Sequence, residues 1–231
     1  YATGWEELYW QNGMSFDAPT SKWGYDDRVV GEAFAEEVIR FSEQESPFLA
    51  GWLTLSSHEP FEVPFAKFDD KVTNAMAFTD DCIGRVIDRL KASPAWENLL
   101  VVFVADHGMP SFRKGTWSET EIHRIPMIWV GGAVRSPAVV DAIGSQIDIA
   151  ATLLAQMGID HSDFEYSKNM LDPSLPKFGY YTYNEGLVMI DEKGESAWDI
   201  PSDRMSEGAD PQQIERGKAL LQQTYEDIAR R

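Results

Sequence analysis

The hydrophobic positions of the chain follow two different periods. Apolar residues at helical spacing predict four helices, at about 30–41, 75–91, 137–157 and 210–231. Apolar runs and a tyrosine- and valine-rich stretch predict strands, at 48–55, 99–105, 122–132 and 179–190, the last of them a hairpin. Asp26 and Asp27 supply helix-start chemistry before the first helix, and Pro126 predicts an irregular or edge position for the third strand. This alternation of helices and strands indicates an α/β fold.

The run 99–105 ends abruptly in Asp106, His107 and Gly108. A continuous apolar run without alternation is typical of a strand covered on both faces, as in a parallel sheet between helices. Such sheets bind ligands beyond the carboxyl ends of their strands. A carboxylate oxygen and an imidazole nitrogen suit Zn or Mn, and further ligands must come from elsewhere. The alternative is an Asp that caps the next turn beside an incidental His.

Two further histidines lie beside predicted strands. His58 follows the strand 48–55, and His123 stands at the start of the strand 122–132. Each alone is compatible with a histidine that only satisfies backbone partners. Together with Asp106 and His107 they favour a site at the edge of the sheet.

Composition limits the classes of function. The 231 residues are 43% hydrophobic, which predicts one domain or most of one. With 38 acidic against 20 basic residues, the net charge of -18 disfavours nucleic acid and anionic membranes as partners of the general surface. A local basic pocket around Arg113 and Lys114 stays possible, with an exposed loop pair as the alternative.

A single cysteine, Cys82, excludes an internal disulfide and lies on the apolar stripe of the helix 75–91, which predicts a core position. No apolar stretch reaches the length of a membrane span, and no charged-then-apolar leader opens the sequence. Because the first residue is Tyr1 rather than Met, we expect the chain to be a piece of a longer protein.

Five motifs in a fixed order carry a family resemblance: a Ser-x-His-x-Pro-Phe turn, a Thr-Asp-x-x-Ile-Gly helix, the strand-Asp-His-Gly element, Ile-Pro-Met, and Gln-Ile-Asp-Ile-Ala-x-Thr-Leu-Leu. They lie at 56–61, 79–84, 106–108, 125–127 and 146–154. The set resembles the sulfatase-like branch of the alkaline phosphatase superfamily, and most of all its lipoteichoic acid synthase and phosphoglycerol transferase group. The resemblance covers roughly residues 25 to 171. It implies a three-layer sandwich with a mostly parallel central sheet and helices on both faces, here incomplete at the N-terminus.

The resemblance also implies roles for individual residues. Asp106 and His107 would be two ligands of a catalytic divalent metal, Mn, Mg or Zn. His58 would contact the phosphoryl group or the leaving oxygen, and His123 is a second catalytic candidate. Arg113, from the possible basic pocket and not from the resemblance, is the candidate for binding substrate. Three positions look like family scaffold, with the aspartate capping or bracing a helix: Gln146, Asp148 and Thr152.

The family nucleophile, a Thr or a modified Cys, has no counterpart in this sequence and would precede Tyr1. Residues 1–231 are therefore expected to be the C-terminal part of a single catalytic domain, inactive alone. The implied parent is an extracytoplasmic enzyme, anchored in the membrane by helices outside the chain, that acts on phosphate or sulfate esters. Phosphoglycerol-type transfer to an envelope glycan or lipid is the leading hypothesis, and the oligomeric state stays open.

Two alternatives remain. One is a true sulfatase, or a phosphodiesterase or phosphomutase of the same superfamily. The other is a non-catalytic module that binds an envelope glycan or protein through the acidic surface and exposed aromatic residues such as Trp5, Trp10 and Trp23.

Overall fold

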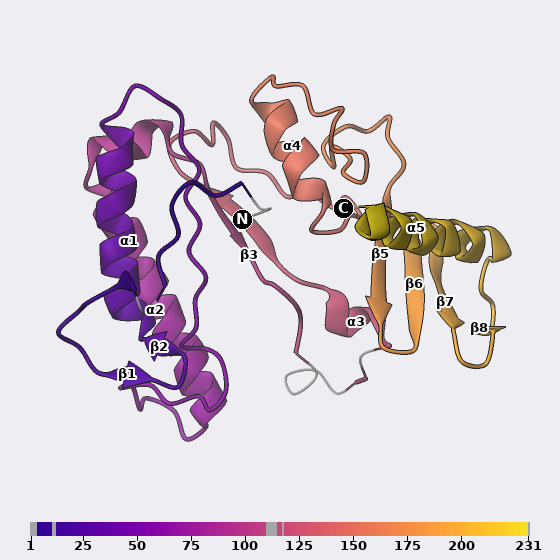
Figure 1. Cartoon of the computed structure of the whole chain (residues 1–231), viewed down its shortest axis with the longest axis horizontal. Coiled ribbons are helices and arrows are strands. Elements are labelled where there is room, and N and C mark those ends of the chain that lie inside the picture. Colours follow the sequence, from indigo (N-terminus) through magenta and orange to yellow (C-terminus); the bar gives the residue numbers. More distant parts are fainter. Residues whose placement is uncertain (1–3, 11–12, 110–114, 117, 231) are drawn as a thin grey trace. The chain divides into compact units, whose positions relative to one another are not determined.

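The computed structural model describes residues 4–10, 13–109, 115–116, 118–230 of the chain (Figure 1). The chain divides into two compact units. The first unit comprises residues 1–101 and 129–135, and the second comprises residues 102–128 and 136–231. Because helices and strands are mixed in the described part of the chain, the predicted α/β class is confirmed.

The first unit is built on two long helices, α1 (Asp27–Ser42) and α2 (Lys71–Lys91), followed by the short helix η2 (Pro94–Asn98). Asp26 caps α1 by accepting the N–H groups of Arg28 and Val29, and Asp70 caps α2. The helical spacing brings together a core of four buried residues: Ala35, Val38, Val86 and Leu90. A small antiparallel pair, β1 (Thr20–Ser21) and β2 (Gly24–Tyr25), precedes α1.

The prediction of a strand over 48–55 is wrong. The segment is not assigned to a strand, and no other described segment forms a ladder with it. Its side chains nevertheless alternate: Ala50 and Trp52 pack against the helical core, while Leu49 and Leu53 are 79% and 71% exposed. The apolar run does not specify which face is buried, because the buried and the exposed side chains are both apolar. A strand also needs a hydrogen-bonded neighbour, which the pattern of one segment does not specify.

Two short strands, β3 (Val101–Val104) and β4 (Met127–Val130), form a sheet of their own. β4 begins only after Pro126, and the preceding residues form the helix α3 (Thr120–His123). The prediction of a strand from residue 122 is therefore wrong at its start. The physical reason is Pro126, which has no N–H to donate to a sheet and is tolerated where a strand begins. After β4, a Cβ at Gly131 would collide with the carbonyl oxygen of Leu99, so the chain needs glycine there.

The second unit contains a four-stranded antiparallel sheet in the order β5-β6-β7-β8. The strands are β5 (Phe178–Tyr183), β6 (Gly186–Asp191), β7 (Gly194–Asp199) and β8 (Arg204–Met205). The predicted hairpin over 179–190 is confirmed as β5 and β6, whereas β7 and β8 were not predicted. This four-stranded sheet is antiparallel throughout and is separate from the β3-β4 pair, whereas the resemblance implies a mostly parallel central sheet.

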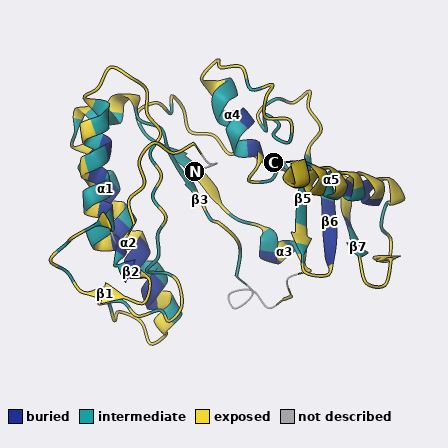
Figure 2. Ribbon diagram, in the orientation of Figure 1, coloured by how far each residue is buried: buried dark blue, intermediate teal, exposed yellow. Residues whose placement is uncertain are grey.

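The last helix, α5 (Pro211–Arg230), lies across this sheet (Figure 1). Ile214 of α5 is buried, as are Leu187 and Met189 of β6. Figure 2 shows β6 as largely buried. A Cβ at Gly217 would lie 2.7 Å from the Leu187 side chain, so this glycine allows the helix to approach the sheet closely. The prediction of a helix that starts at Asp210 and Pro211 is confirmed.

The helix predicted over 137–157 is confirmed only in its second half, as α4 (Asp148–Gln156). The carboxylate of Asp148 accepts the N–H of Ser145 at 2.8 Å, which ties the chain back at the point where the helix begins. Val139 and Val140, which belong to the apolar pattern of the predicted helix, are 90% and 56% exposed. Among the helices that the structure describes, none has the length and apolar composition to cross a bilayer.

Candidate functional site

Asp106 and His107 lie directly beyond the carboxyl end of β3, as the sequence predicts, and both side chains are open to solvent. The Asp106 carboxylate accepts the backbone N–H of His107 at 2.9 Å. His107 Nδ1 lies 2.7 Å from the carbonyl oxygen of Gly108. Since a carbonyl oxygen can only accept, Nδ1 is the donor in this contact, and Nε2 is the ring nitrogen left to act as a metal ligand. Nε2 lies 3.5 Å from Asp106 Oδ2, so the two potential ligand atoms face one another.

This donor set fits a divalent metal. A histidine that ligates a metal through one ring nitrogen usually donates the other N–H to a backbone carbonyl or a carboxylate, which is the arrangement of His107 and Gly108. A carboxylate oxygen beside an imidazole nitrogen suits Mn or Zn, and carboxylates also suit Mg. Within the described residues no group of three or more His, Cys, Asp or Glu side chains gathers into a complete metal site. The pair alone would therefore supply only part of a coordination sphere.

Gly108, which follows His107, is required by a close approach of the backbone and not by its own backbone conformation. Its φ is not positive, but a Cβ at this position would collide with the carbonyl oxygen of Ile122. Glycine is therefore required because α3 passes close to the loop that carries Asp106 and His107. This contact brings the helix that ends in His123 beside the candidate metal ligands.

His123 is the last residue of α3 rather than part of a strand. Its ring stacks on the Tyr181 ring of β5, with centroids 3.7 Å apart and planes 18° apart. The Tyr181 hydroxyl donates to the carbonyl oxygen of Ser118 at 3.0 Å and lies 3.2 Å from Thr120 Oγ1. Burial raises the pKa of Tyr181 to about 12, so this phenol stays protonated and holds α3 against the sheet.

Gln146 lies just before α4 and reaches the same loop. Its Nε2 donates to the carbonyl oxygens of Ala105 and Asp106 at 2.6 and 2.9 Å. The scaffold role predicted for Asp148 and Thr152 is confirmed. Buried Asp148 accepts hydrogen bonds from Ser145 and Lys168, and the Thr152 hydroxyl donates to the Asp148 carbonyl oxygen at 2.6 Å.

His58 lies in the first unit, in the turn after the extended segment 48–55. The Trp23 ring packs on the His58 ring with centroids 4.3 Å apart, and Trp23 Nε1 donates to the carbonyl oxygen of Glu59. Phe61, which closes the turn, has a φ of 60°, a backbone conformation that is costly for a bulky residue and that concentrates at functional sites. Trp23 was considered in the sequence only as an exposed aromatic residue, so its contact with His58 was missed.

Asp27 is the second feature that the sequence missed. It is 1% exposed, and its carboxylate accepts the N–H groups of Leu55 and Ser56 and the hydroxyl of Thr79. The sequence placed Asp26 and Asp27 together as helix-start residues, but only Asp26 caps α1. The sequence could have indicated this role, because an acidic residue at a helix position that faces the core requires buried hydrogen-bond donors.

The remaining residues singled out in the sequence lie outside the candidate site or outside the described residues. Arg113 and Lys114 lie outside the described residues. Cys82 is 2% exposed, and burial raises its pKa to about 12, which confirms the predicted core position. Trp5 and Trp10 are about half exposed, at 44% and 53%.

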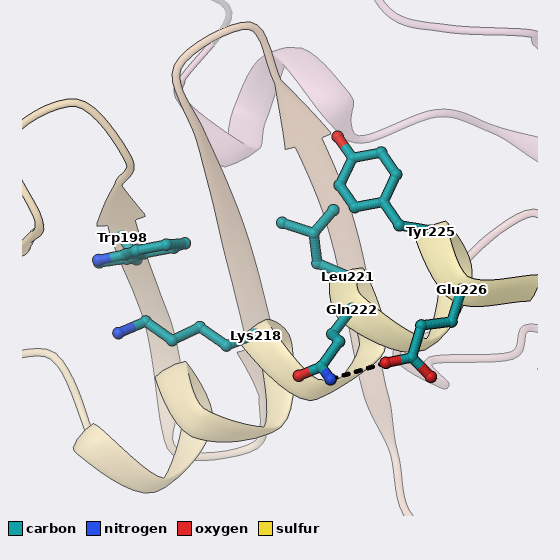
Figure 3. Close-up of a pocket in the computed structure, with 6 residues that line it drawn as sticks. All are labelled: Trp198, Lys218, Leu221, Gln222, Tyr225 and Glu226. Atoms are coloured by element: carbon teal, nitrogen blue, oxygen red, sulfur yellow. Dashed lines mark hydrogen bonds between the residues drawn. The ribbon is translucent and has the colours of Figure 1, made fainter. Parts of the chain in front are cut away.

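A shallow groove of about 380 Å³ lies between α5 and β7. Leu221 lies between the Trp198 and Tyr225 rings, and the Lys218 ammonium lies 4.2 Å from the centre of the Trp198 ring (Figure 3). None of the residues that line the groove is a predicted site residue: Trp198, Lys218, Leu221, Gln222, Tyr225 and Glu226.

Comparison with solved structures confirms the predicted fold. A protein of the alkaline phosphatase superfamily from Vibrio parahaemolyticus matches with a TM-score of 0.74 and 23% sequence identity. The match covers 94% of this chain and 59% of that chain. It shows that the two units are built from the elements of an alkaline phosphatase-like fold.

Two curated relatives have names that agree with the group suggested by the motifs. The lipoteichoic acid synthase-like protein YvgJ of Bacillus subtilis is 22% identical over 186 residues, which are 69% of this chain and 30% of the relative. Phosphoglycerol transferase I of Xanthomonas campestris is 24% identical over 169 residues, which are 68% of this chain and 24% of the relative. The chain thus spans less than a third of the length of either relative.

The family model described as Sulfatase matches residues 2–159. The matched region includes the extended segment before His58, the strand before Asp106 and the whole of α4. Since this region is well over half of the sequence, the chain belongs to the sulfatase family.

Proposed function

We propose that this chain is the C-terminal part of the catalytic domain of a metal-dependent enzyme that transfers or hydrolyses phosphate or sulfate esters. Phosphoglycerol-type transfer to a cell-envelope glycan or lipid is the proposed reaction. The observation that carries the proposal is the Asp106–His107 pair, in which Nε2 of His107 lies 3.5 Å from the Asp106 carboxylate. The names of the two curated relatives support the choice of phosphoglycerol transfer.

Asp106 and His107 would hold the metal, Mn, Mg or Zn. When bound, such an ion lowers the pKa of a hydroxyl nucleophile and offsets the charge that develops on phosphoryl or sulfuryl oxygens. Asp106 contributes an anionic oxygen to the site. The carbonyl oxygen of Gly108 keeps the Nδ1 proton of His107 in place, so that Nε2 is presented as a ligand.

His58 would act on the substrate side. A histidine there can hydrogen-bond to a transferring group and give a proton to the departing alkoxide. Trp23 packs against its ring, and Asp27 holds the turn from which it projects. Stacking on Tyr181 fixes the ring plane of His123, the second catalytic candidate. Arg113 is kept as a proposed contact for an anionic substrate.

The proposed nucleophile is a Thr or a modified Cys, and we have identified no residue of this chain in that role. We therefore propose that residues 1–231 alone are inactive. That the chain covers 59% of a solved superfamily member and under a third of its curated relatives supports this part of the proposal. We place the parent enzyme outside the cytoplasm, anchored by helices that are not in this chain.

The test uses the protein expressed from its full reading frame. Three substrates separate the reactions: an aryl phosphodiester, an aryl sulfate and a lipid with a phosphoglycerol headgroup. Each is assayed with Mn²⁺ and after treatment with EDTA. We expect phosphodiester or phosphoglycerol turnover that EDTA abolishes, and a loss of at least about 100-fold in Asp106→Asn. Asp163→Asn, an exposed aspartate outside the site, is the matched control and should keep the parent rate.

A different substrate preference in this assay would identify a second candidate function. The matching family model is that of the sulfatases, which favours sulfate ester hydrolysis as the second candidate function. Turnover of the aryl sulfate alone would replace phosphoglycerol transfer by that function. Turnover that neither EDTA nor Asp106→Asn affects would overturn the proposed metal site.

A further inference from the structure

The side chain of Gln146 holds the backbone on both sides of Asp106. Its Nε2 donates to the carbonyl oxygen of Ala105 at 2.6 Å and to that of Asp106 at 2.9 Å. Both partners are acceptors only, so the amide nitrogen, and not the amide oxygen, must face them. We propose that Gln146 is a positioning residue that sets the geometry of the Asp106–His107 pair and thereby its affinity for a divalent metal. This inference rests on the proposed function of that pair.

The two carbonyl groups belong to the peptide groups that flank the Asp106 Cα. The peptide plane that contains the Ala105 oxygen fixes φ of Asp106, and the plane that contains the Asp106 oxygen fixes ψ. Since φ and ψ are the soft variables of the backbone, holding both planes fixes the direction in which the Asp106 side chain leaves the chain. One amide group therefore sets the direction of the Asp106 Cα–Cβ bond, from which the carboxylate projects.

The same peptide group also contacts the carboxylate itself. The peptide between Asp106 and His107 accepts Gln146 Nε2 through its oxygen, and its N–H donates to Asp106 Oδ1 at 2.9 Å. A shift of this peptide would move the carboxylate and the start of the His107 side chain together. Gln146 is thus coupled to both proposed ligands through the backbone.

Gln146 projects from a well-anchored segment. The neighbouring Ser145 donates its N–H to the buried Asp148 carboxylate at 2.8 Å. Its hydroxyl accepts the N–H of Tyr180 at 2.9 Å and donates to the Tyr180 carbonyl oxygen at 3.2 Å, which ties the segment to β5. Asp148 in turn pairs with Lys168 at 2.5 Å. The base of the Gln146 side chain is therefore fixed by hydrogen bonds to a helix and a sheet.

The proposed ligands need such support because they are exposed. The side chain of Asp106 is 71% exposed and that of His107 is 55% exposed, so little packing restricts them. Partners that orient metal ligands from outside the coordination sphere typically contribute 10- to 100-fold to metal affinity. Gln146 is itself exposed, so its removal should act on the loop more than on the core.

The test is a calorimetric titration with Mn²⁺ of the protein expressed from its full reading frame. Gln146→Ala removes both hydrogen bonds, and Gln146→Glu keeps the shape but turns a carboxylate oxygen toward two carbonyl oxygens. We expect the Kd for Mn²⁺ to rise about 10- to 100-fold in both variants. Because both ligands remain, turnover at saturating Mn²⁺ should approach the parent value. Gln222→Ala, on the exposed face of α5, is the matched control and should leave the Kd unchanged.

Asp106→Ala distinguishes a failure of the positioning role of Gln146 from a failure of the proposed metal site. If Asp106→Ala loses Mn²⁺ binding while both Gln146 variants keep a Kd within about twofold of the parent, the positioning role is overturned and the metal site stands. If Asp106→Ala binds Mn²⁺ like the parent, the proposed function fails first. A lower melting temperature in the Gln146 variants with an unchanged Kd would show a structural role only, and would also overturn the inference.

Discussion

Asp27 and Ser56 are joined by two reciprocal hydrogen bonds. The Asp27 carboxylate accepts the N–H of Ser56 at 2.9 Å, and the Ser56 hydroxyl accepts the N–H of Asp27 at the same distance. The carboxylate also accepts the N–H of Leu55 and the hydroxyl of Thr79. The start of α1, a residue of α2 and the turn before His58 are therefore held by one buried side chain.

The first prediction concerns this side chain. Asp27→Ala leaves three hydrogen-bond donors of a buried region without their acceptor, and each such loss costs about 1–3 kcal/mol. We expect the free energy of unfolding, measured with urea, to fall by about 3 kcal/mol or more. Asp26→Ala, which removes the cap of α1 and a solvent-exposed ion pair with Arg28, should cost about 1 kcal/mol. Equal losses in the two variants would contradict the role assigned to Asp27.

The second prediction concerns the ion pair between Asp148 and Lys168. The Asp148 side chain is 1% exposed and that of Lys168 is 15% exposed. Lys168→Met leaves a buried carboxylate without its cation, and we expect a loss of about 3–5 kcal/mol of unfolding free energy. Lys177→Met breaks an exposed pair with Glu192 and should change stability by about 1 kcal/mol or less. A small effect of Lys168→Met would show that the pair does not anchor α4.

The third prediction is a loss of stability at alkaline pH. Burial raises the pKa of Cys82, Tyr180 and Tyr181 from 9.0 or 10.0 to about 12. The unfolded chain therefore ionises before the folded chain, so the stabilisation from these groups is complete below pH 9 and is lost as the pH rises toward 12. Urea midpoints measured from pH 8 to pH 11 should decline above pH 9. Cys82→Ala should make this decline shallower, and an unchanged slope would contradict the burial of the thiol.

The fourth prediction separates His58 from the metal ligands. In the protein expressed from its full reading frame, His58→Ala should lower kcat by about 10²- to 10⁴-fold, the usual effect of losing a general acid or base. The Kd for Mn²⁺ should stay at the parent value. His161→Ala, a change in the fourth histidine, should alter neither quantity. If His58→Ala weakens Mn²⁺ binding as well, His58 belongs to the metal site rather than to the substrate side.

Much of the fold follows from local patterns. Apolar spacing predicts α1, α2 and α5 because each helix buries one stripe, and an abrupt end to an apolar run predicts Asp106 and His107 beyond β3. The segment 48–55 is a case that local patterns do not predict. Its apolar run reveals neither which side chains are buried, since exposed Leu49 and Leu53 are apolar too, nor which second segment it would pair with. The helix 137–157 is shortened for a similar reason, since the Asp148 carboxylate that binds Ser145 acts through one side chain and not through periodicity.

The candidate site, too, could be predicted from the sequence only in part. Residue types and motif order identify the proposed metal ligands, because these carry the chemistry. The supporting contacts depend on three-dimensional proximity: Gln146 lies some forty positions from the carbonyl groups it binds, and Trp23 lies far from Glu59 in sequence. The stacking of His123 on Tyr181 likewise joins α3 to a strand that no local pattern connects with it.

The most direct test of the central claim is the effect of Mn²⁺ on thermal unfolding of the protein expressed from its full reading frame. An ion that binds the native state, present at a concentration 100 times its Kd, stabilises that state by about 2.7 kcal/mol. The parent should therefore melt at a higher temperature with Mn²⁺ than with EDTA. The account predicts that Asp106→Ala and His107→Ala each abolish this shift while Asp163→Asn keeps it. A shift of the same size in the parent and in both ligand variants would contradict the claim that Asp106 and His107 bind the metal.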